Sequence, residues 1–192
     1  MSRSDQGLTR DKERTRLAVL EAAERMFAER GARVSLSDIA TAAGVTKGGL
    51  MHHFPNRGAL LAGVTEHLIA KVWAEVHEQI DLSENRPGKF TRGYVRALTS
   101  GSESVTRAFS PTGLLVALGS ARDLEELFAA DARRLHEAFA ADGLAAATTS
   151  VIRFAAEGLA TAADSPYLTA EQLETARAEL LAMTESAAPH HG

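Results

Sequence analysis

The sequence contains no cysteine and no apolar run near the roughly 18 residues that a membrane-spanning helix needs. The first absence excludes a disulfide framework, and the second argues against a membrane span. The start, Met1 to Arg10, is polar, and a secretory signal would need an apolar segment after a basic one. We therefore expect a cytoplasmic protein whose 192 residues suffice for one or two cores.

The motifs of common enzyme classes are also missing. The chain has no glycine-rich phosphate loop, no Gly-x-Ser-x-Gly elbow and no His-Glu-x-x-His helix. His52 and His53 are adjacent, so on a helix they face different directions, and His190 and His191 fall in an expected tail. These absences predict a protein that is not an enzyme and that needs no cofactor or metal.

Positive charge is scarce overall but unevenly placed. The formal net charge is -4. Residues 1–58 nevertheless hold ten Lys or Arg against seven Asp or Glu, a net +3, and residues 59–192 hold eleven against eighteen, a net -7. Because binding to nucleic acid depends on cations near the phosphates, the positive N-terminal part is the candidate for such binding.

The segment 35–54 has the pattern of two short helices joined by a glycine turn. Ser35 is a typical helix N-cap, and Asp38 three residues later makes an approximate capping box. Gly44 suits the left-handed residue after a helix, and Thr46 is a second N-cap. This is the layout of a DNA-binding helix-turn-helix, although an ordinary helical hairpin would show the same glycine turn.

The second helix of this pair has one apolar side, formed by Leu50 and Phe54. Its other faces carry Lys47, Met51, His52 and His53. Gly48 and Gly49 each cost about 1 kcal/mol relative to alanine within a helix, but they let a backbone approach a surface closely. The N-terminal residues of such a helix enter the major groove, and here these are Thr46, Lys47, Gly48 and Gly49.

Residues 15 to about 61 resemble the DNA-binding domain of TetR-family transcriptional regulators. The matching positions are Ala22-Ala23, Phe27, Gly31, Ile39-Ala40, Ala43-Gly44-Val45, Lys47-Gly48, Leu50, His53-Phe54 and Arg57. Two positions depart from the family pattern, because Met51 replaces an aromatic residue and Gly58 replaces an acidic one. The resemblance implies a homodimer that binds a near-palindromic operator, most often as a repressor.

We assign a DNA contact to each residue on the expected DNA-binding surface. Lys47 is assigned to a base edge or a nearby phosphate, and Thr46, Gly48 and Gly49 to close contact with the groove. The residues expected to position the protein on the DNA backbone are Ser35, His52, His53 and Arg57, with Met51 on the same surface. The alternatives are that Ser35 and Thr46 only cap helices, that Arg57 is solvated and that one histidine is packed beneath the helix.

No segment shows the alternation of a strand, so the predicted fold is all-α. We expect an N-terminal tail at 1–9, a three-helix helix-turn-helix domain at 10–56, a helical-bundle domain for ligand binding and dimerisation at 57–186 and a C-terminal tail at 187–192. After the helix-turn-helix domain, the predicted helices are 56–82, 90–98, 114–118, 123–141, 144–163 and 169–184.

The resemblance also implies an effector pocket and a dimer seam in the second domain. The candidates for the wall of a pocket for a small hydrophobic ligand are Trp73, His77, Phe90, Tyr94, Leu98, Phe109, Leu115, Leu118, Phe128, Phe139 and Ile152. The candidates for the seam are Val151, Phe154, Ala155, Leu159, Leu173, Ala176 and Leu180. Both sets could instead be plain core. Control by a protein partner, and activation in place of repression, are open alternatives.

Overall fold

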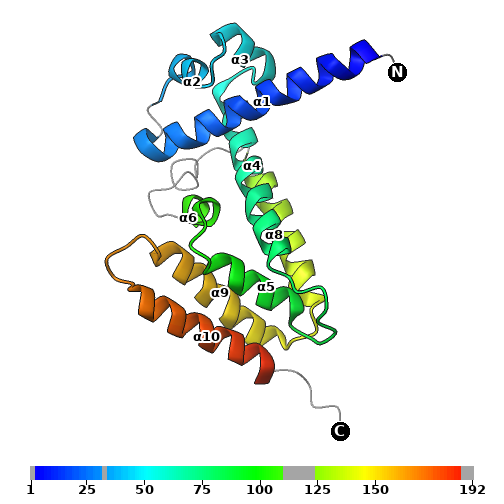
Figure 1. Ribbon diagram of the computed structural model, residues 1–192, viewed down its shortest axis with the longest axis vertical. Coiled ribbons are helices and arrows are strands. Elements are labelled where there is room, and N and C mark those ends of the chain that lie inside the picture. Colours follow the sequence, from blue (N-terminus) through cyan, green and yellow to red (C-terminus); the bar gives the residue numbers. More distant parts are fainter. Residues whose placement is uncertain (1–2, 32–33, 110–123, 187–192) are drawn as a thin grey trace. The chain divides into compact units, whose positions relative to one another are not determined.

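A computed structural model describes residues 3–31, 34–109 and 124–186 of the chain, and every regular element in these ranges is helical (Figure 1). The all-α prediction is confirmed. The helices are α1 (Arg3–Arg30), α2 (Leu36–Ala42), α3 (Lys47–His53), α4 (Arg57–Glu78), α5 (Lys89–Leu98), α6 (Glu103–Phe109), α8 (Glu125–Ala140), α9 (Ala146–Ala162) and α10 (Ala170–Ser186).

The helices group into two compact units. Within the described residues, the first unit comprises 3–31, 34–67 and 124–125, and the second comprises 68–109 and 126–186. Helix α4 contributes its first part to one unit and its second part to the other. The domain border expected after residue 56 stays a prediction.

The helix ends differ from the expected ones at several places. Helix α1 begins at Arg3, within the segment 1–9 that was expected to be a tail. A helix can continue through this segment, because it has no proline and a lone glycine costs only about 1 kcal/mol. Helix α6 forms in a segment for which no helix is predicted, and the predicted helix 114–118 and tail 187–192 lie outside the described residues.

Helix α4 stops at Glu78, four residues earlier than expected. The side chain of Asp81 explains the early stop, because its Oδ1 accepts hydrogen bonds from the Ser83 backbone N–H at 2.9 Å and from the Ser83 hydroxyl. This local turn competes with a further helical turn. The same two bonds lower the pKa of the Asp81 carboxyl.

The first unit is held by apolar side chains of its helices. Helix α1 packs against α2 and α3, and its buried face includes Leu20, Ala23 and Phe27. Ile39 of α2 and Leu50 of α3 are both fully buried, as the spacing of apolar residues predicts.

The turn between α2 and α3 is built from backbone hydrogen bonds. The N–H of Val45 donates to the carbonyl of Ala40 at 2.9 Å, and the N–H of Gly44 donates to Thr41 at 3.1 Å. This pair of bonds is a Schellman motif. Gly44 has a φ of 69°, so its left-handed conformation is the reason for a glycine at this position.

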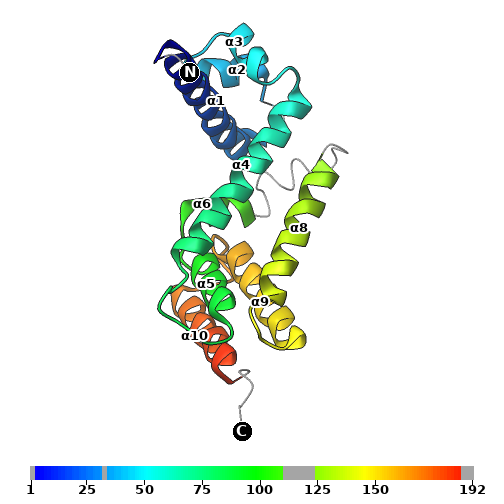
Figure 2. The ribbon, with the colours of Figure 1, turned by 90° about the vertical axis from the view of Figure 1, so that its right-hand side faces the viewer.

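In the second unit, α5 lies side by side with α9 and α10, as both ribbon views show (Figures 1 and 2). Helix α6 also packs on α9. Most of α5 is buried, including Tyr94, Val95 and Leu98. Their core partners on the neighbouring helices include Ile152, Ala156 and Leu180. Helix α5 is therefore the central element of this unit.

The start of α5 is capped by a side chain from a distant part of the sequence. Gly88 at the N-cap position has no side chain to offer and a φ of 87°. The carboxylate of Asp142, in the turn after α8, accepts hydrogen bonds from the backbone N–H groups of Phe90 and Thr91 at 2.7 and 2.8 Å. A carboxylate at this place also interacts favourably with the helix dipole.

A buried ion pair fixes α5 to the turn before it. Arg92 is 1% exposed, and its guanidinium contacts Glu84 at 2.6 Å while Nη1 donates to the carbonyl of Pro87 at 3.0 Å. Burial would raise the pKa of the Glu84 carboxyl, but the hydrogen bond from Arg92 and nearby arginine charges outweigh burial and lower it. Both groups are therefore charged at neutral pH.

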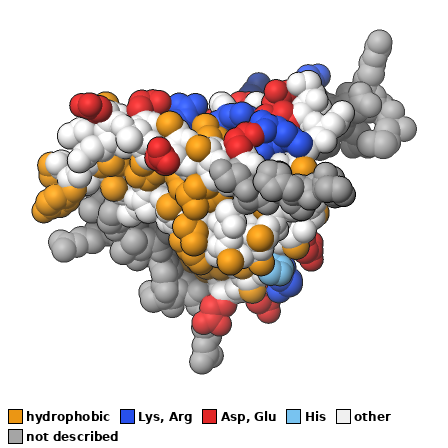
Figure 3. All heavy atoms as spheres, turned by 90° about the horizontal axis from the view of Figure 1, so that it is seen from below, with side chains coloured by type: hydrophobic (Ala, Val, Ile, Leu, Met, Phe, Trp, Pro, Cys, Tyr) orange, Lys and Arg blue, Asp and Glu red, His pale blue; other side chains and the backbone are white. Residues whose placement is uncertain are grey.

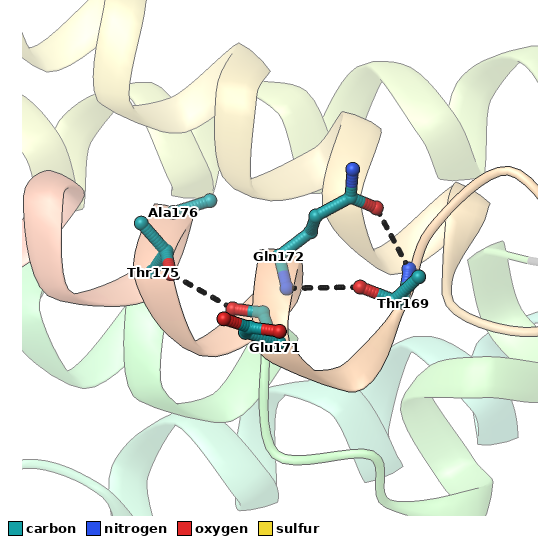
Figure 4. Close-up of a pocket in the computed structure, with 5 residues that line it drawn as sticks. All are labelled: Thr169, Glu171, Gln172, Thr175 and Ala176. Atoms are coloured by element: carbon teal, nitrogen blue, oxygen red, sulfur yellow. Dashed lines mark hydrogen bonds between the residues drawn. The ribbon is translucent and has the colours of Figure 1, made fainter.

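Helix α10 begins with a capping box. The backbone N–H of Gln172 donates to the Thr169 hydroxyl at 3.2 Å, and the N–H of Thr169 donates to Gln172 Oε1 at 2.9 Å (Figure 4). These two bonds satisfy backbone donors that the first helical turn leaves without partners.

Replacing Glu84 with glutamine is expected to lower the free energy of unfolding by about 3 kcal/mol, because the Arg92 guanidinium then stays buried without a carboxylate. Urea unfolding followed by circular dichroism measures the change. The matched control is Glu174→Gln, which removes an exposed ion pair with Arg177 and should cost less than about 0.5 kcal/mol. Equal effects of the two variants would contradict a structural role for the Glu84–Arg92 pair.

Candidate functional sites

Helix α3 presents a distinct outer face in the first unit. Lys47, Gly48, Met51 and His52 are exposed, and Leu50 is fully buried. Thr46 caps the helix, its hydroxyl accepting the N–H of Gly49 at 3.0 Å. The polar face that the sequence predicts is thus directed away from the core, on a helix whose start is fixed.

The two glycines of α3 meet different surroundings. A Cβ at Gly49 would lie 3.3 Å from the Thr46 hydroxyl oxygen, so the cap itself favours glycine there. A Cβ at Gly48 would meet only that same oxygen, at an ordinary 3.9 Å. The fold does not require a glycine at position 48, which leaves close approach of an external partner as a reason for it.

Ser35 and Asp38 form a complete capping box at the start of α2. The backbone N–H of Asp38 donates to the Ser35 hydroxyl oxygen at 3.1 Å, and the Asp38 carboxylate accepts from the Ser35 N–H at 3.4 Å and from its hydroxyl at 2.7 Å. The predicted cap is confirmed. Ser35 remains exposed, so a further contact with a phosphate stays a prediction.

Arg57 is attached to its own unit. Its Nη1 donates to the carbonyl of Val34 at 2.6 Å, and its guanidinium carbon lies 5.3 Å from the centre of the Phe27 ring. The side chain therefore ties the start of α4 to α1 and to the segment before α2. A phosphate contact by Arg57 stays a prediction, and it would have to use other N–H groups of the guanidinium.

His53 lies in a cationic environment that includes residues of α1. Burial lowers the pKa of His53, and the charges of His52, Lys12 and Arg16 lower it further. Neither Lys12 nor Arg16 is among the predicted DNA-binding residues. Both lie far from α3 in the sequence, so the sequence does not show that they are near His53, although their spacing of four places them on the same side of α1.

Five of the predicted pocket residues, Trp73, His77, Phe90, Tyr94 and Phe139, form an aromatic cluster in the second unit. The ring of Phe139 lies 5.1 Å from the rings of both Phe90 and Tyr94, and Trp73 lies 5.9 Å from Phe90. Trp73 also stacks near His77, at 5.7 Å. The edge-on contacts of Phe139 are the arrangement that aromatic rings prefer in a packed core.

The remaining predicted pocket residues are divided. Leu98 and Ile152 belong to the buried core, and Phe109 and Phe128 are half-buried. His77, at the edge of the aromatic cluster, is exposed, and its Nδ1 lies 2.7 Å from the carbonyl of Trp73. Leu115 and Leu118 lie outside the described residues.

The polar ends of Trp73 and Tyr94 bind protein groups. The indole N–H of Trp73 donates to Asp131 at 2.7 Å, and the Tyr94 hydroxyl donates to Glu157 at 2.9 Å. Burial raises the pKa of Tyr94 far above its usual value, and the Glu157 carboxylate raises it further. The phenol is therefore a neutral donor at physiological pH.

Two of the hollows formed by described residues of the second unit bear on a ligand site. One, of about 280 Å³, is lined by His136, Phe139, Ala140, Leu144, Ala146, Thr149, Ser150 and Arg153. The other, of about 500 Å³, lies along the start of α10 and is open to solvent (Figure 4). Of the residues that line the first hollow, only Phe139 was predicted as part of the pocket wall. The α9 residues 146, 149, 150 and 153 were missed, although their spacing of three and four residues places them on one side of a helix.

The residues expected at a dimer seam differ in exposure. Val151 and Phe154 on α9 are 56% and 63% exposed, and Leu180 on α10 is only 6% exposed. Ala155, Leu159, Leu173 and Ala176 are partly buried. Hydrophobic side chains gather on the face shown in Figure 3, bordered by acidic and basic ones. The burial of Leu180 in the core argues against a direct role for it in a seam.

The two parts of the sequence each match a described family. Residues 19–64 match "Bacterial regulatory proteins, tetR family", and residues 88–185 match "Tetracyclin repressor-like, C-terminal domain". The second match covers more than half of the chain. The chain belongs to the TetR family. The resemblance seen in residues 15–61 is thereby confirmed.

Relatives within the TetR family agree with this assignment. The HTH-type transcriptional regulator TtgR of Pseudomonas putida is 47% identical over 55 residues, which are 28% of this chain and 26% of TtgR. The chain thus aligns with about a quarter of that relative's length. A Rhodococcus transcriptional regulator has a similar fold, with a TM-score of 0.70 and 22% identity over 92% of this chain and 97% of that one.

Another TetR-like structure with this fold holds a ligand. The regulator LfrR of Mycobacterium smegmatis, in complex with proflavine, has a TM-score of 0.56 and 22% identity, and the match covers 88% of this chain and 96% of LfrR. Both family matches and these relatives are regulators, in line with the prediction that the chain is not an enzyme.

Two kinds of feature are absent from the described residues. None of the described helices is long and apolar enough to cross a membrane. Nowhere in ranges 3–31, 34–109 and 124–186 do three or more His, Asp or Glu side chains gather as a metal site would require.

The environment of His53 predicts a pH dependence with a defined sign. The unfolded chain binds this proton more tightly than the folded one, so the free protein loses stability as the pH falls below about 6.5. A DNA phosphate beside His53 would favour the protonated form. Affinity for DNA is therefore expected to rise as the pH is lowered from about 7.5 to about 5.5, measured by fluorescence anisotropy at constant ionic strength.

The variants His53→Gln and His52→Gln separate the two neighbouring histidines. His53→Gln should flatten the pH dependence of DNA affinity, and His52→Gln should keep most of it. A slope that His53→Gln leaves unchanged would show that other groups take up the proton.

Proposed function

We propose that the protein is a sequence-specific, DNA-binding transcriptional regulator that binds a near-palindromic operator as a homodimer and represses transcription until a small molecule releases it. The observation that carries the proposal is the outward face of α3, with its capped start and its exposed Lys47, Gly48 and Met51. Such a regulator acts where DNA is, in the cytoplasm.

The proposed contacts follow from the geometry of α2 and α3. The N-terminal end of the second helix in a helix-turn-helix approaches the base edges, which places Lys47 and Gly48 at the groove. Lys47 would donate to a guanine edge or a phosphate, and the bare backbone at Gly48 would allow the close approach. Met51 offers an apolar contact, for example with a thymine methyl group.

Side chains at the rim of this surface would hold the DNA backbone. Ser35 lies at the start of α2, and His52 and His53 lie at the end of α3. Lys12 and Arg16 of α1 add positive charge near His53. Contacts of this kind set the position of the protein on the duplex and contribute little sequence preference.

The dimer is proposed from the exposed apolar residues of α9. Val151 and Phe154 are three positions apart on one helix and more than half exposed, which is unfavourable for a surface that stays in water. A second copy of the chain would cover them. Two reading heads could then address half-sites about one DNA turn (~34 Å) apart, or a multiple of it.

Release by a small molecule is proposed from the family and from the neighbour that holds proflavine. The ligand would prefer a conformer in which the spacing of the two DNA-binding domains does not match the operator. It would then weaken DNA binding by the ratio of its affinities for this conformer and for the DNA-binding conformer. Helix α4 contributes residues to both units, so we propose it as the lever.

Selection of bound duplexes from a random DNA pool tests the proposal. We expect enrichment of one inverted repeat that is bound far more tightly than random DNA. Lys47→Ala should weaken binding to this repeat and, if Lys47 contacts a phosphate, lower the slope of log affinity against log salt by about one unit. Arg133→Ala, which removes an exposed cation of α8, is the matched control and should leave both quantities unchanged. Uniform weak binding with no enriched repeat would refute the proposal.

The dimer is tested by placing a charge in the proposed seam. Phe154→Glu should convert the dimer to a monomer at micromolar concentration, because a carboxylate would be buried against the partner. Sedimentation velocity measures the mass. Leu82→Glu changes another exposed apolar residue, in the turn after α4, and should leave the dimer intact. A wild-type monomer, with and without DNA, would contradict the proposed dimer.

A further inference from the structure

A recess of about 280 Å³ in the second unit lies between the end of α8 and the start of α9. Ala146, Thr149, Ser150 and Arg153 line it from one face of α9, and Phe139 lines it from α8. The volume is close to the lower end of the roughly 300–1,000 Å³ of small-molecule sites. It suits a ligand with one ring.

The hydroxyl of Thr149 has no hydrogen-bond partner, although the residue is only 6% exposed. Thr99, the C-cap of α5, and Thr161 on α9 behave differently. The hydroxyls of Thr99 and Thr161 donate to the carbonyls four residues earlier, at 2.6 and 2.8 Å. A buried hydroxyl without a partner loses its hydration and gains nothing in return, so it is a favourable place for a ligand atom.

Two features place hydrogen-bond donors on the same wall of the recess. Helix α9 has 17 residues, and its N-cap residue, Ala145, provides no side-chain hydrogen bond, so the positive end of the helix dipole is not neutralised. Arg153 lies two turns further along the same face. Its Nε donates to Glu157 at 2.7 Å, and a guanidinium has further N–H groups for a second acceptor.

The opposite side is mostly apolar. Phe139 and Ala140 line it from α8, together with His136, and Leu144 lines it from the following turn. Phe139 also packs on Tyr94 and Phe90 at the start of α5, so the floor of the recess is continuous with the aromatic cluster. A ligand ring placed here would extend that cluster by one more aromatic contact.

We propose that this recess binds a small aromatic carboxylate, whose ring packs against Phe139 and whose carboxylate accepts the Thr149 hydroxyl beside the start of α9 and Arg153. This differs from the hydrophobic ligand that the sequence predicts, because the wall formed by α9 carries polar hydrogen-bond donors. The role of the carboxylate as the effector rests on the proposed function; its binding does not.

Isothermal titration of the full-length protein with benzoate tests the recess, with benzamide as the neutral probe of nearly the same shape. Benzoate is expected to bind at least about tenfold more tightly than benzamide, because only the carboxylate forms charge-assisted hydrogen bonds. Thr149→Val should weaken benzoate binding about tenfold, and Thr149→Ser should restore it.

Thermal unfolding distinguishes a ligand-binding hydroxyl from a structural one. Thr149→Val should raise the melting temperature of the free protein, because the change removes a buried hydroxyl that has no partner. Thr65 in α4 is the matched control, since its hydroxyl is also buried without a partner but does not line the recess. Thr65→Val should leave benzoate binding unchanged.

Three results would overturn the proposal: equal affinity for benzoate and benzamide, full benzoate affinity in Thr149→Val, or a lower melting temperature in that variant. Binding to the selected operator is measured separately, without benzoate. Its absence would contradict the proposed function while the calorimetry still decides the recess. Benzoate binding that leaves operator affinity unchanged would support the recess and contradict its role as the effector site.

Discussion

The buried start of α5 is the constraint on which the second unit depends. Helix α5 packs on α9 and α10, so its first N–H groups need partners that water cannot supply. Asp142 provides two acceptor oxygens from the turn after α8, and the Glu84–Arg92 pair fixes the preceding turn. One carboxylate thus determines where α8 ends relative to α5, and with it the position of Phe139 against the aromatic cluster.

In the first unit, the backbone groups at the helix ends find their hydrogen-bond partners within a few residues of sequence. Ser35 and Thr46 cap α2 and α3, and the Schellman motif at Gly44 closes the turn between them. Because these bonds lie within 20 residues of sequence, the helix pair needs only Leu50 and Ile39 to attach it to α1. The exposed face of α3 is then free to differ among regulators without loss of the fold.

The second unit shows why the role of a polar group at the end of an apolar side chain cannot be read from the sequence. Trp73 and Tyr94 have the character of ligand-orienting residues, but Asp131 and Glu157 satisfy them. Thr149 gave no such signal, because a threonine in a helix normally bonds its own backbone. It becomes notable only when the structure shows its hydroxyl buried without a partner.

The sequence by itself determined the all-α fold and the caps at Ser35 and Thr46, because caps and apolar spacing act over three or four residues. It also indicated the exposed face of α3, since Leu50 fixes which side is buried. Only the tertiary structure decided that Lys12 and Arg16 lie near His53, that Asp142 caps α5 and that a recess forms beside Thr149. The physical reason is range: these relations join groups far apart along the chain or depend on how neighbouring helices pack, and no local pattern records such an approach.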